Sequence, residues 1–239
     1  MKGSDLYDEP AFFARYQRMR EAGAGLNEAL EQPALARLLP AVRDLDVVEL
    51  GCGDGAQARR LADAGARSVL AVDSAARMLE RAVRQPHRGV RYLRADIETL
   101  DLPGSGADLV VSSLALHYVA GYQGLLARVS RWLRPGGHLV FSVEHPIRTA
   151  RWAAGPYGQE TARVHTWFGT EVIKHHRRLA TLVGGVLAAG LALTGLDEPQ
   201  PDARILAERP DLDEHRDLPP LLLISASKPA DKLLGAAGT

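Results

Sequence analysis

The chain has 239 residues, 46% of them hydrophobic, and its 29 basic and 29 acidic side chains balance to a formal net charge of +0 at pH 7. This length and apolar content suit one α/β domain with a single large core. No basic run marks a nucleic-acid-binding surface, so we expect neither DNA nor RNA as a partner. The single cysteine, Cys52, excludes an internal disulfide and fits a reducing compartment.

Aromatic side chains gather in two segments, although they make up only 5% of the chain. They are Tyr7, Phe12, Phe13 and Tyr16 before the first predicted strand, and Trp152, Tyr157, Trp167 and Phe168 after the fifth. Because ligands bind beyond the carboxyl ends of the strands of an open parallel sheet, we predict that both segments fold over that edge as a lid. Phe12, Trp152 and Trp167 would then contact an apolar or aromatic substrate. The alternative is that these rings only pack peripheral helices against the sheet.

The segment 47–55 joins a predicted buried strand to a glycine turn. Glycines stand at alternate positions, Gly51, Gly53 and Gly55, and a helix is predicted to begin at Ala56. Such glycines let the backbone turn sharply and approach a ligand closely, and the free N–H groups at the start of the helix suit an anionic group. We therefore predict a cofactor site, in which Cys52 is a small residue of the turn rather than a nucleophile.

The glycine spacing alone fits two classes of cofactor. Gly51, Gly53 and Ala56 also satisfy the dinucleotide fingerprint, and Asp73 follows at about the distance of the acid in that fingerprint. Glu49 argues against a dinucleotide, since an apolar residue usually precedes the glycines there. A nicotinamide-dependent oxidoreductase is the less favoured alternative.

Further strands are predicted at residues 68–73, 90–96, 107–113 and 137–143, and two of them end in an acidic residue. Asp73 suits the two hydroxyls of a ribose. Asp96 suits the exocyclic amine of an adenine, with Ile97 packing on the ring. Chemical signals at the carboxyl ends of successive strands are more specific than one glycine turn.

The late part of the chain predicts a helix and two more strands. The apolar stretch 179–193 is interrupted by glycines and too short for a bilayer, so we interpret it as a buried helix. Strands are predicted at 191–197 and 221–226, with a proline-rich surface loop between them. The polar N-terminus predicts no signal peptide, so we expect a cytoplasmic protein without a membrane partner.

In chain order, these segments resemble the class I S-adenosylmethionine-dependent methyltransferases. The matching segments are ELGCGDG, AVDSAARML, RADIETLDLP, DLVVSSLALHYV and LRPGGHLVFSVEHP. The chain is most similar to bacterial small-molecule methyltransferases that carry YxxMR and GLN early and KHHR late, here at 16–20, 25–27 and 174–177. The resemblance implies an α/β, Rossmann-like sheet of seven strands in the order 3-2-1-4-5-7-6, the last strand antiparallel, with helices on both faces.

The resemblance also implies one domain and a set of binding residues. The domain would comprise an N-terminal helical lid (1–40), a cofactor-binding core (41–144), a substrate-lid insertion (145–175) and a C-terminal helix with the last two strands (176–239). S-adenosylmethionine is the implied cofactor and S-adenosylhomocysteine its product, without a metal. The implied cofactor-binding residues are Tyr16, Arg20, Glu49, Gly51, Cys52, Gly53, Asp73, Ser74, Met78, Asp96, Ile97, Ser112 and Leu114.

Methyl transfer depends mainly on alignment, and a base is needed only if the nucleophile carries a proton. The candidate bases are His145, then His176 and His175, then His117, all near the carboxyl-end edge; each could equally be a hydrogen-bonded structural residue. We expect methylation of a small apolar or aromatic molecule at N, O or C by a monomer or homodimer. The alternative is a protein that binds the cofactor without transferring methyl, in an assembly role or another cofactor-assisted reaction.

Overall fold

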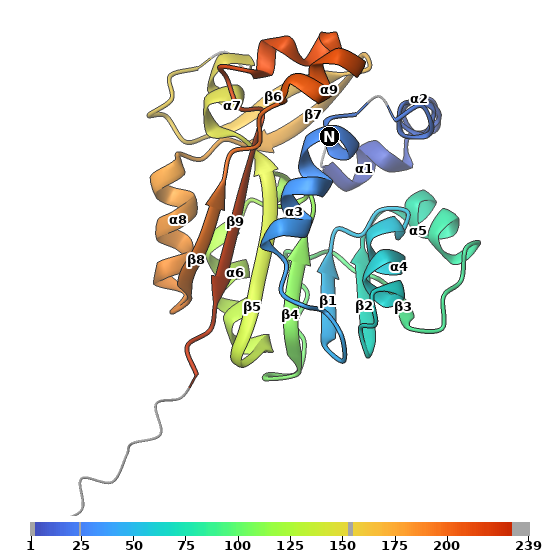
Figure 1. The fold of residues 1–239 in the computed structure, drawn as a ribbon, viewed down its shortest axis with the longest axis vertical. Coiled ribbons are helices and arrows are strands. Elements are labelled where there is room, and N and C mark those ends of the chain that lie inside the picture. The colour runs from blue at the N-terminus through green and yellow to red at the C-terminus, as the bar shows by residue number, and fades with distance from the viewer. Residues whose placement is uncertain (1–2, 24, 153–154, 231–239) are drawn as a thin grey trace, which may run out of the picture.

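The computed structural model describes residues 3–23, 25–152 and 155–230 and contains a seven-stranded sheet in the order β3-β2-β1-β4-β5-β9-β8 (Figure 1). Its strands are β1 (Asp46–Leu50), β2 (Ser68–Asp73), β3 (Val90–Arg94), β4 (Ala107–Ser112), β5 (Leu133–Glu144), β8 (Ala192–Asp197) and β9 (Leu221–Ser227). β9 runs antiparallel to both of its neighbours, β5 and β8, and the other pairings in this sheet are parallel. The predicted strand order and orientation are therefore confirmed.

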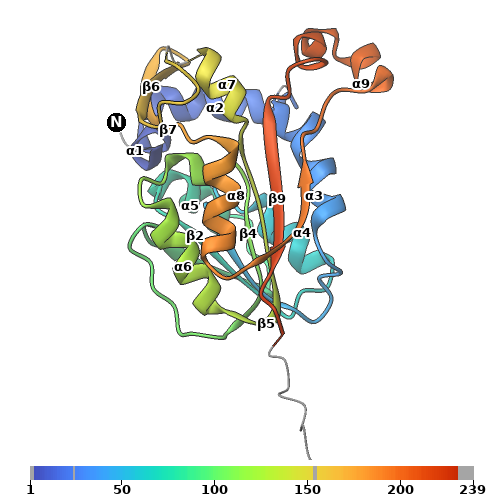
Figure 2. The same cartoon turned by 90° about the vertical axis from the view of Figure 1, so that its left-hand side faces the viewer.

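Helices cover both faces of this sheet. Figure 2 shows α3 (Gln32–Leu38) and α4 (Ala56–Asp63) on one side, and α6 (Tyr122–Trp132) and α8 (Leu179–Ala188) on the other. The side chains of β1 point to both faces of the sheet. Val47 packs in the core with α3 and α4, whereas Val48 and Leu50 pack in the core with α6 and α8. Burial on both faces explains why the strands are almost continuously apolar. The remaining core helix, α5 (Ala76–Val83), follows β2.

A second group of elements lies above the carboxyl ends of the parallel strands (Figure 1). It comprises α1 (Gly3–Asp8), α2 (Pro10–Glu21), the π-helical turn η1 (Asn27–Glu31), the 3₁₀ turn η2 (Leu116–Tyr118), α7 (Pro146–Trp152), β6 (Ala162–Trp167), β7 (Thr170–His175), α9 (Ala203–Glu208) and the 3₁₀ segment η3 (Pro210–His215). β6 and β7 pair as an antiparallel hairpin, which the sequence analysis does not predict. The two aromatic segments of the sequence meet here, since Phe12 lies edge-on to Trp167 with ring centroids 5.2 Å apart.

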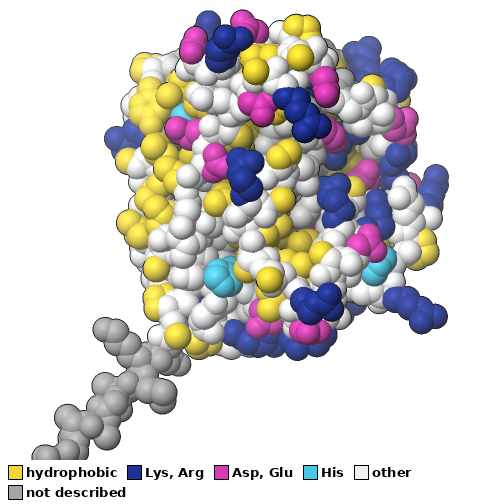
Figure 3. Space-filling view, viewed as in Figure 1, with side chains coloured by type: hydrophobic (Ala, Val, Ile, Leu, Met, Phe, Trp, Pro, Cys, Tyr) yellow, Lys and Arg dark blue, Asp and Glu magenta, His cyan; other side chains and the backbone are white. Residues whose placement is uncertain are grey.

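Apolar side chains are exposed at the β8 edge of the sheet. The space-filling view shows them along the side where α8 and β8 lie (Figure 3). Leu187, Leu193 and Leu196 are exposed by 54%, 39% and 45%; Leu193 and Leu196 belong to the edge strand β8, and Leu187 belongs to α8. In the described ranges, no helix combines the length and the apolar character that a membrane span requires.

Candidate functional site

A cavity of about 800 Å³ opens at the carboxyl ends of the central parallel strands. Its floor is the turn after β1, together with residues that directly follow β2, β3 and β4. Its other walls come from the N-terminal helices and the β6–β7 hairpin, including Tyr7, Tyr16 and Trp167. Its position is the one at which open α/β sheets bind ligands, and its volume is that of a small-molecule site.

The three glycines of the turn are required for two different reasons, although all have positive φ (74°, 54° and 74°). A Cβ on Gly51 would lie 2.3 Å from the Cβ of Ala115, and one on Gly55 would lie 2.4 Å from the Tyr92 hydroxyl. A Cβ on Gly53 would meet no atom within 4 Å, and Gly53 lines the cavity. The first and third glycines thus allow close packing, while the second leaves backbone open to a ligand.

Carboxylates at the ends of β1 and β2 face this turn. Asp73 accepts hydrogen bonds from the backbone N–H of Gly53 at 2.7 Å and of Ala75 at 2.9 Å, which fixes both of its oxygens. Burial raises the pKa of Asp73, and these backbone donors counteract the rise. Glu49 is only 1% exposed, burial raises its pKa to about 8, and its Oε2 has no partner among the described residues. The site therefore holds a buried acceptor atom that no described protein group satisfies.

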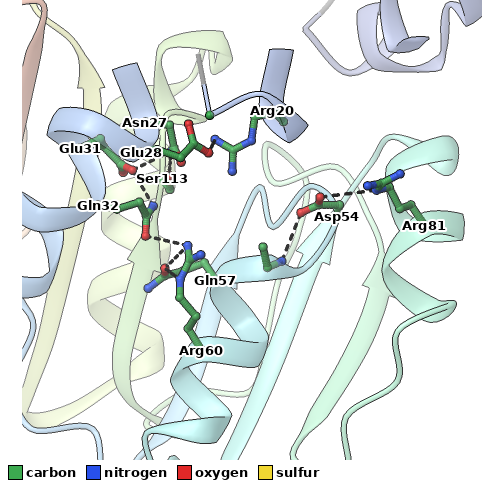
Figure 4. Close-up of polar contacts among 12 residues, drawn as sticks. Arg20, Asn27, Glu28, Glu31, Gln32, Asp54, Gln57, Arg60, Arg81 and Ser113 are labelled. Atoms are coloured by element: carbon green, nitrogen blue, oxygen red, sulfur yellow. Dashed lines mark hydrogen bonds and ion pairs between the residues drawn. The ribbon is translucent and has the colours of Figure 1, made fainter. Parts of the chain in front are cut away.

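A polar network ties the N-terminal segment to the sheet and to α4 (Figure 4). The carboxylate of Glu31 is fully buried and accepts from Gln32 at 2.6 Å, from Asn27 at 2.7 Å and from the Ser142 hydroxyl at 2.7 Å. Gln32 in turn accepts from Arg60 at 2.7 Å. Sequence reasoning missed this network, although the spacing of Asn27 and Glu31 across one helical turn was a usable signal.

Ser142 links the hydrogen-bond network to the backbone of the loop after β4. Its hydroxyl accepts from the backbone N–H of Leu114 at 2.9 Å while donating to Glu31. Leu114 has φ 52°, in the left-handed region that favours glycine. The hydrogen bond from its N–H thus helps to hold a strained residue that lines the cavity.

Another part of the cavity contains a largely buried ion pair that the sequence analysis does not predict. Lys174, on β7, donates to Glu144, at the end of β5, at 2.7 Å. Burial alone would raise the pKa of Glu144, but the charge and hydrogen bond of Lys174, together with neighbours that include Arg148, outweigh burial and lower the pKa to about 2. The Lys174 ammonium lies 5.5 Å from the ring centroid of Trp167 and 5.8 Å from that of Tyr118. Arg148 of α7 also lines this region.

The structure separates the four candidate histidines into two pairs. His117 and His175 line the cavity, and burial lowers the pKa of both, that of His117 to about 3. His145 lies outside the lining, where Nε2 is 2.7 Å from Glu198 and Nδ1 accepts from a backbone N–H. His176 also lies outside, with Nδ1 2.6 Å from Thr149 Oγ1. At the end of an extended strand neighbouring side chains point to opposite faces, so Glu144 reaches the cavity and His145 does not.

Most of the predicted cofactor residues line the same cavity. They are Tyr16, Arg20, Glu49, Gly51, Cys52, Gly53, Asp73, Ser74, Met78, Asp96, Ile97 and Leu114. Ser112 is buried beneath it and donates to the carbonyl of Leu50 at 2.8 Å. Of the predicted substrate contacts, Trp167 lines the cavity, Phe12 is 1% exposed inside the aromatic cluster, and the side chain of Trp152 lies outside the described residues. Within the described ranges, no group of three His, Cys, Asp or Glu side chains could hold a metal ion.

Known proteins are similar to this chain in both sequence and fold. The family model described as a methyltransferase domain matches residues 48–141. An uncharacterized protein of Haemophilus influenzae is 32% identical, covering 93% of this chain and 96% of its own length. The solved S-adenosylmethionine-dependent methyltransferase of Mesorhizobium loti is 41% identical over 85% of this chain and 100% of its own, with a TM-score of 0.79. A putative one from Listeria monocytogenes is 32% identical over 83% and 96%, with a TM-score of 0.78.

Replacing Ser142 by Ala tests the buried network. The change removes the acceptor of the Leu114 N–H and one of the donors to Glu31, and we expect a loss of about 2–4 kcal/mol in the free energy of unfolding. Burial already raises the pKa of Glu31, and Ser142 opposes that rise, so Ser142→Ala raises it further. A carboxyl group whose pKa is raised on folding stabilises the folded protein at pH values below its ordinary pKa near 4.5. This stabilisation is lost as the pH rises through the pKa of the folded state. The loss in Ser142→Ala should therefore grow from pH 5 to pH 8, as measured by denaturant unfolding.

Ser112→Ala is the matched control. Ser112 is equally buried, but it bonds a neutral carbonyl, so its loss should be the same at every pH in this range. A loss in Ser142→Ala that does not change with pH would contradict the role assigned to Glu31.

Proposed function

This chain belongs to the family of S-adenosylmethionine-dependent methyltransferases, and from that membership we propose that its cavity binds the cofactor and a small-molecule methyl acceptor together. The observation that supports the proposal is that one cavity of about 800 Å³ joins the glycine turn to the aromatic wall at Trp167. Residues of α1, α2 and the β6–β7 hairpin line this space, and these elements lie above the carboxyl ends of the parallel strands (Figure 1). Such a covered site suits a small acceptor better than a protein or nucleic-acid chain.

The lining residues fit the chemical groups of S-adenosylmethionine. Asp73 would hold the ribose hydroxyls, with Gly53 leaving room for close approach of the backbone. Asp96 and Ile97 would hold the adenine. Arg20 pairs with Glu28 at 2.7 Å, and its remaining N–H donors would hold the carboxylate of the methionine portion.

Two buried oxygen atoms could accept hydrogen bonds from the ammonium group of the methionine portion. Oε2 of Glu49 and Oδ1 of Asn27 are buried without described partners, and both residues line the cavity. A buried acceptor without a partner is costly, and a bound cation would remove that cost.

When bound, the cofactor supplies an electrophilic methyl group on a sulfonium sulfur. The chain's own task is then to orient the acceptor and exclude water, and the rings of Tyr16 and Trp167 supply such a wall. His117 is neutral throughout the physiological range, because burial lowers its pKa to about 3. It can accept a hydrogen bond at Nδ1, which has no described partner, but it is a weak base. Alignment of an acceptor at N, O or C is therefore the main contribution that we propose.

Transfer of a labelled methyl group tests the class of acceptor. The protein is incubated with methyl-labelled S-adenosylmethionine and a cell extract, and the label is then divided by ultrafiltration. We expect the label in the small-molecule filtrate, because the cavity is covered. Label retained mainly with protein or nucleic acid would contradict a small acceptor, and the Gly53→Ala variant provides the background.

Gly53→Ala tests the cofactor position. The added Cβ points into open space, so the protein should fold, with a loss of about 1–2 kcal/mol from the positive φ. Binding of S-adenosylhomocysteine should weaken at least about tenfold, because the Cβ occupies ligand space. Gly136→Ala is the control, since Gly136 also has positive φ (81°) and an open Cβ position but lies outside the cavity lining. Equal affinity in both variants would place the cofactor elsewhere.

Glu49 should make cofactor binding depend on pH. Its pKa of about 8 means that Glu49 carries a proton at pH 6.5 in the free protein, whereas a bound ammonium favours the ionised form. Binding should therefore release a proton, and affinity should rise from pH 6 towards pH 8 by up to about tenfold per unit. Calorimetry of S-adenosylhomocysteine binding in two buffers of different ionisation enthalpy measures that proton.

Glu49→Gln should abolish the proton release. Glu98→Gln is its control, since Glu98 also lines the cavity but accepts from the backbone N–H of Ala120 at 2.6 Å. Proton release that persists in Glu49→Gln would assign the proton to another group.

A further inference from the structure

We propose that the ion pair of Lys174 and Glu144 binds a neutral amide or lactam group of the methyl acceptor. The carbonyl oxygen of that group would accept a hydrogen bond from Lys174, and its N–H would donate to Glu144. This inference rests on the proposed function, because it names a class of acceptor for the same cavity. It goes beyond that function in assigning recognition of the acceptor to one residue on β7 and one on β5.

Both members of the pair line the cavity and keep hydrogen-bonding capacity. An ammonium carries three N–H donors, and Lys174 uses one of them for Oε1 of Glu144 at 2.7 Å. Within the described ranges, neither the remaining donors of Lys174 nor Oε2 of Glu144 has a hydrogen-bond partner. Their side chains are only 7% and 19% exposed, so water reaches these atoms poorly. A ligand that supplies both missing partners would therefore be favoured.

The short distance between the two charges selects a neutral ligand. Glu144 is ionised, since its charged neighbours outweigh burial and lower its pKa to about 2. A carboxylate bound to Lys174 would lie beside the like charge of Glu144, and an ammonium bound to Glu144 would lie beside Lys174. Like charges brought together in a desolvated site repel strongly. A neutral group that both donates and accepts avoids either repulsion.

The charges around the pair agree with a neutral ligand. Arg148 lines the same region and interacts electrostatically with two carboxylates, Glu144 and Glu214. Arg148 thus adds a cation and Glu214 a carboxylate, which leaves the sum of these charges unchanged. Burial lowers the pKa of His117 and of His165, so both rings are neutral at pH 7.

Aromatic rings beside the pair indicate the body of the acceptor. The Lys174 ammonium lies 5.5 Å from the ring centroid of Trp167 and 5.8 Å from that of Tyr118, and both rings line the cavity. An amide conjugated with an aromatic ring is flat. Its polar edge can meet the ion pair while its ring lies against these walls. We therefore assign the amide or lactam to an aromatic or heteroaromatic acceptor.

A hydroxyl group is the rival ligand, because it also donates and accepts hydrogen bonds. It does both through a single oxygen atom. An amide presents its acceptor and its donor on two atoms, as the ion pair presents its donor and its acceptor on two side chains. The amide is therefore the better match to the pair.

Five small aromatic probes distinguish these possibilities: benzamide, acetophenone, benzyl alcohol, benzoate and benzylamine. Each is titrated by calorimetry into protein saturated with S-adenosylhomocysteine. Acetophenone keeps the carbonyl of benzamide but lacks its N–H, so this comparison measures the hydrogen bond to Glu144. We expect benzamide to bind most tightly of the five, and at least about tenfold more tightly than acetophenone, because hydrogen bonds to charged groups are strong.

Substitution of either member should change which probe binds best. Glu144→Gln leaves the positive charge of Lys174 unopposed within the pair, so benzoate should become the tightest ligand. Lys174→Met leaves the carboxylate, so benzylamine should become the tightest. Glu144→Gln decides the question alone if Lys174→Met fails to fold. Arg178→Gln is the control: Arg178 is paired with Glu160 at 3.3 Å outside the cavity lining, so its loss should leave the order of affinities unchanged.

The outcomes separate this inference from the proposed function. Failure to bind S-adenosylhomocysteine would overturn the proposed function. Normal binding of that product, with another probe as tight as benzamide or with no probe binding measurably, would overturn this inference alone. An order of affinities that stays the same in Glu144→Gln would also overturn it.

Discussion

The parallel pairing of β1 with β2 and β4 fixes where the glycine turn and the carboxylate at the end of β2 lie in the cavity. Leu50 pairs with Val72 in register, so Gly51 and Asp73 leave their strands side by side. The N–H groups of Gly51 and Cys52 both donate to the carbonyl of Val72, at 2.8 Å and 3.0 Å. The turn is thus an extension of the strand hydrogen bonding, and a slip of one residue would point Asp73 away from it. The hydrogen bonds of Glu31 and Ser142 connect the N-terminal segment to the same end of the sheet.

The cofactor half of the cavity could be predicted because its determinants are local. Each determinant directly follows a strand that apolar patterning reveals, and parallel strands bring their carboxyl ends to one edge. The sheet order followed from a resemblance carried by several such segments. Even so, the glycines differ in role, and only the contacts of Gly51 and Gly55 with Ala115 and Tyr92 show which of them faces open space.

The other half depends on contacts between distant segments. Glu31 and Ser142 are 111 residues apart in the sequence, and Lys174 and Glu144 are 30 apart. Neither pair leaves a local pattern, and in the hairpin that positions Lys174 the buried positions include Arg163 and Lys174 while Val164 is exposed, so hydrophobicity does not follow burial. The histidine candidates show the same limit. Proximity to a strand end was visible in the sequence, but the face on which each ring lies depends on the pleat and on partners such as Glu198.

The antiparallel direction of β9 separates the two ends of the described chain. β9 begins at Leu221, which pairs with Glu144 and lines the cavity, and ends at Ser227, which pairs with His138. The chain therefore leaves the sheet at the edge opposite the cavity, whereas Gly3 lies in the cavity wall (Figure 1). For immobilisation on a sensor surface, an attachment point beyond Ser227 leaves ligand access open. An affinity tag placed before Gly3 would begin next to the cavity wall, so that position is the less suitable one.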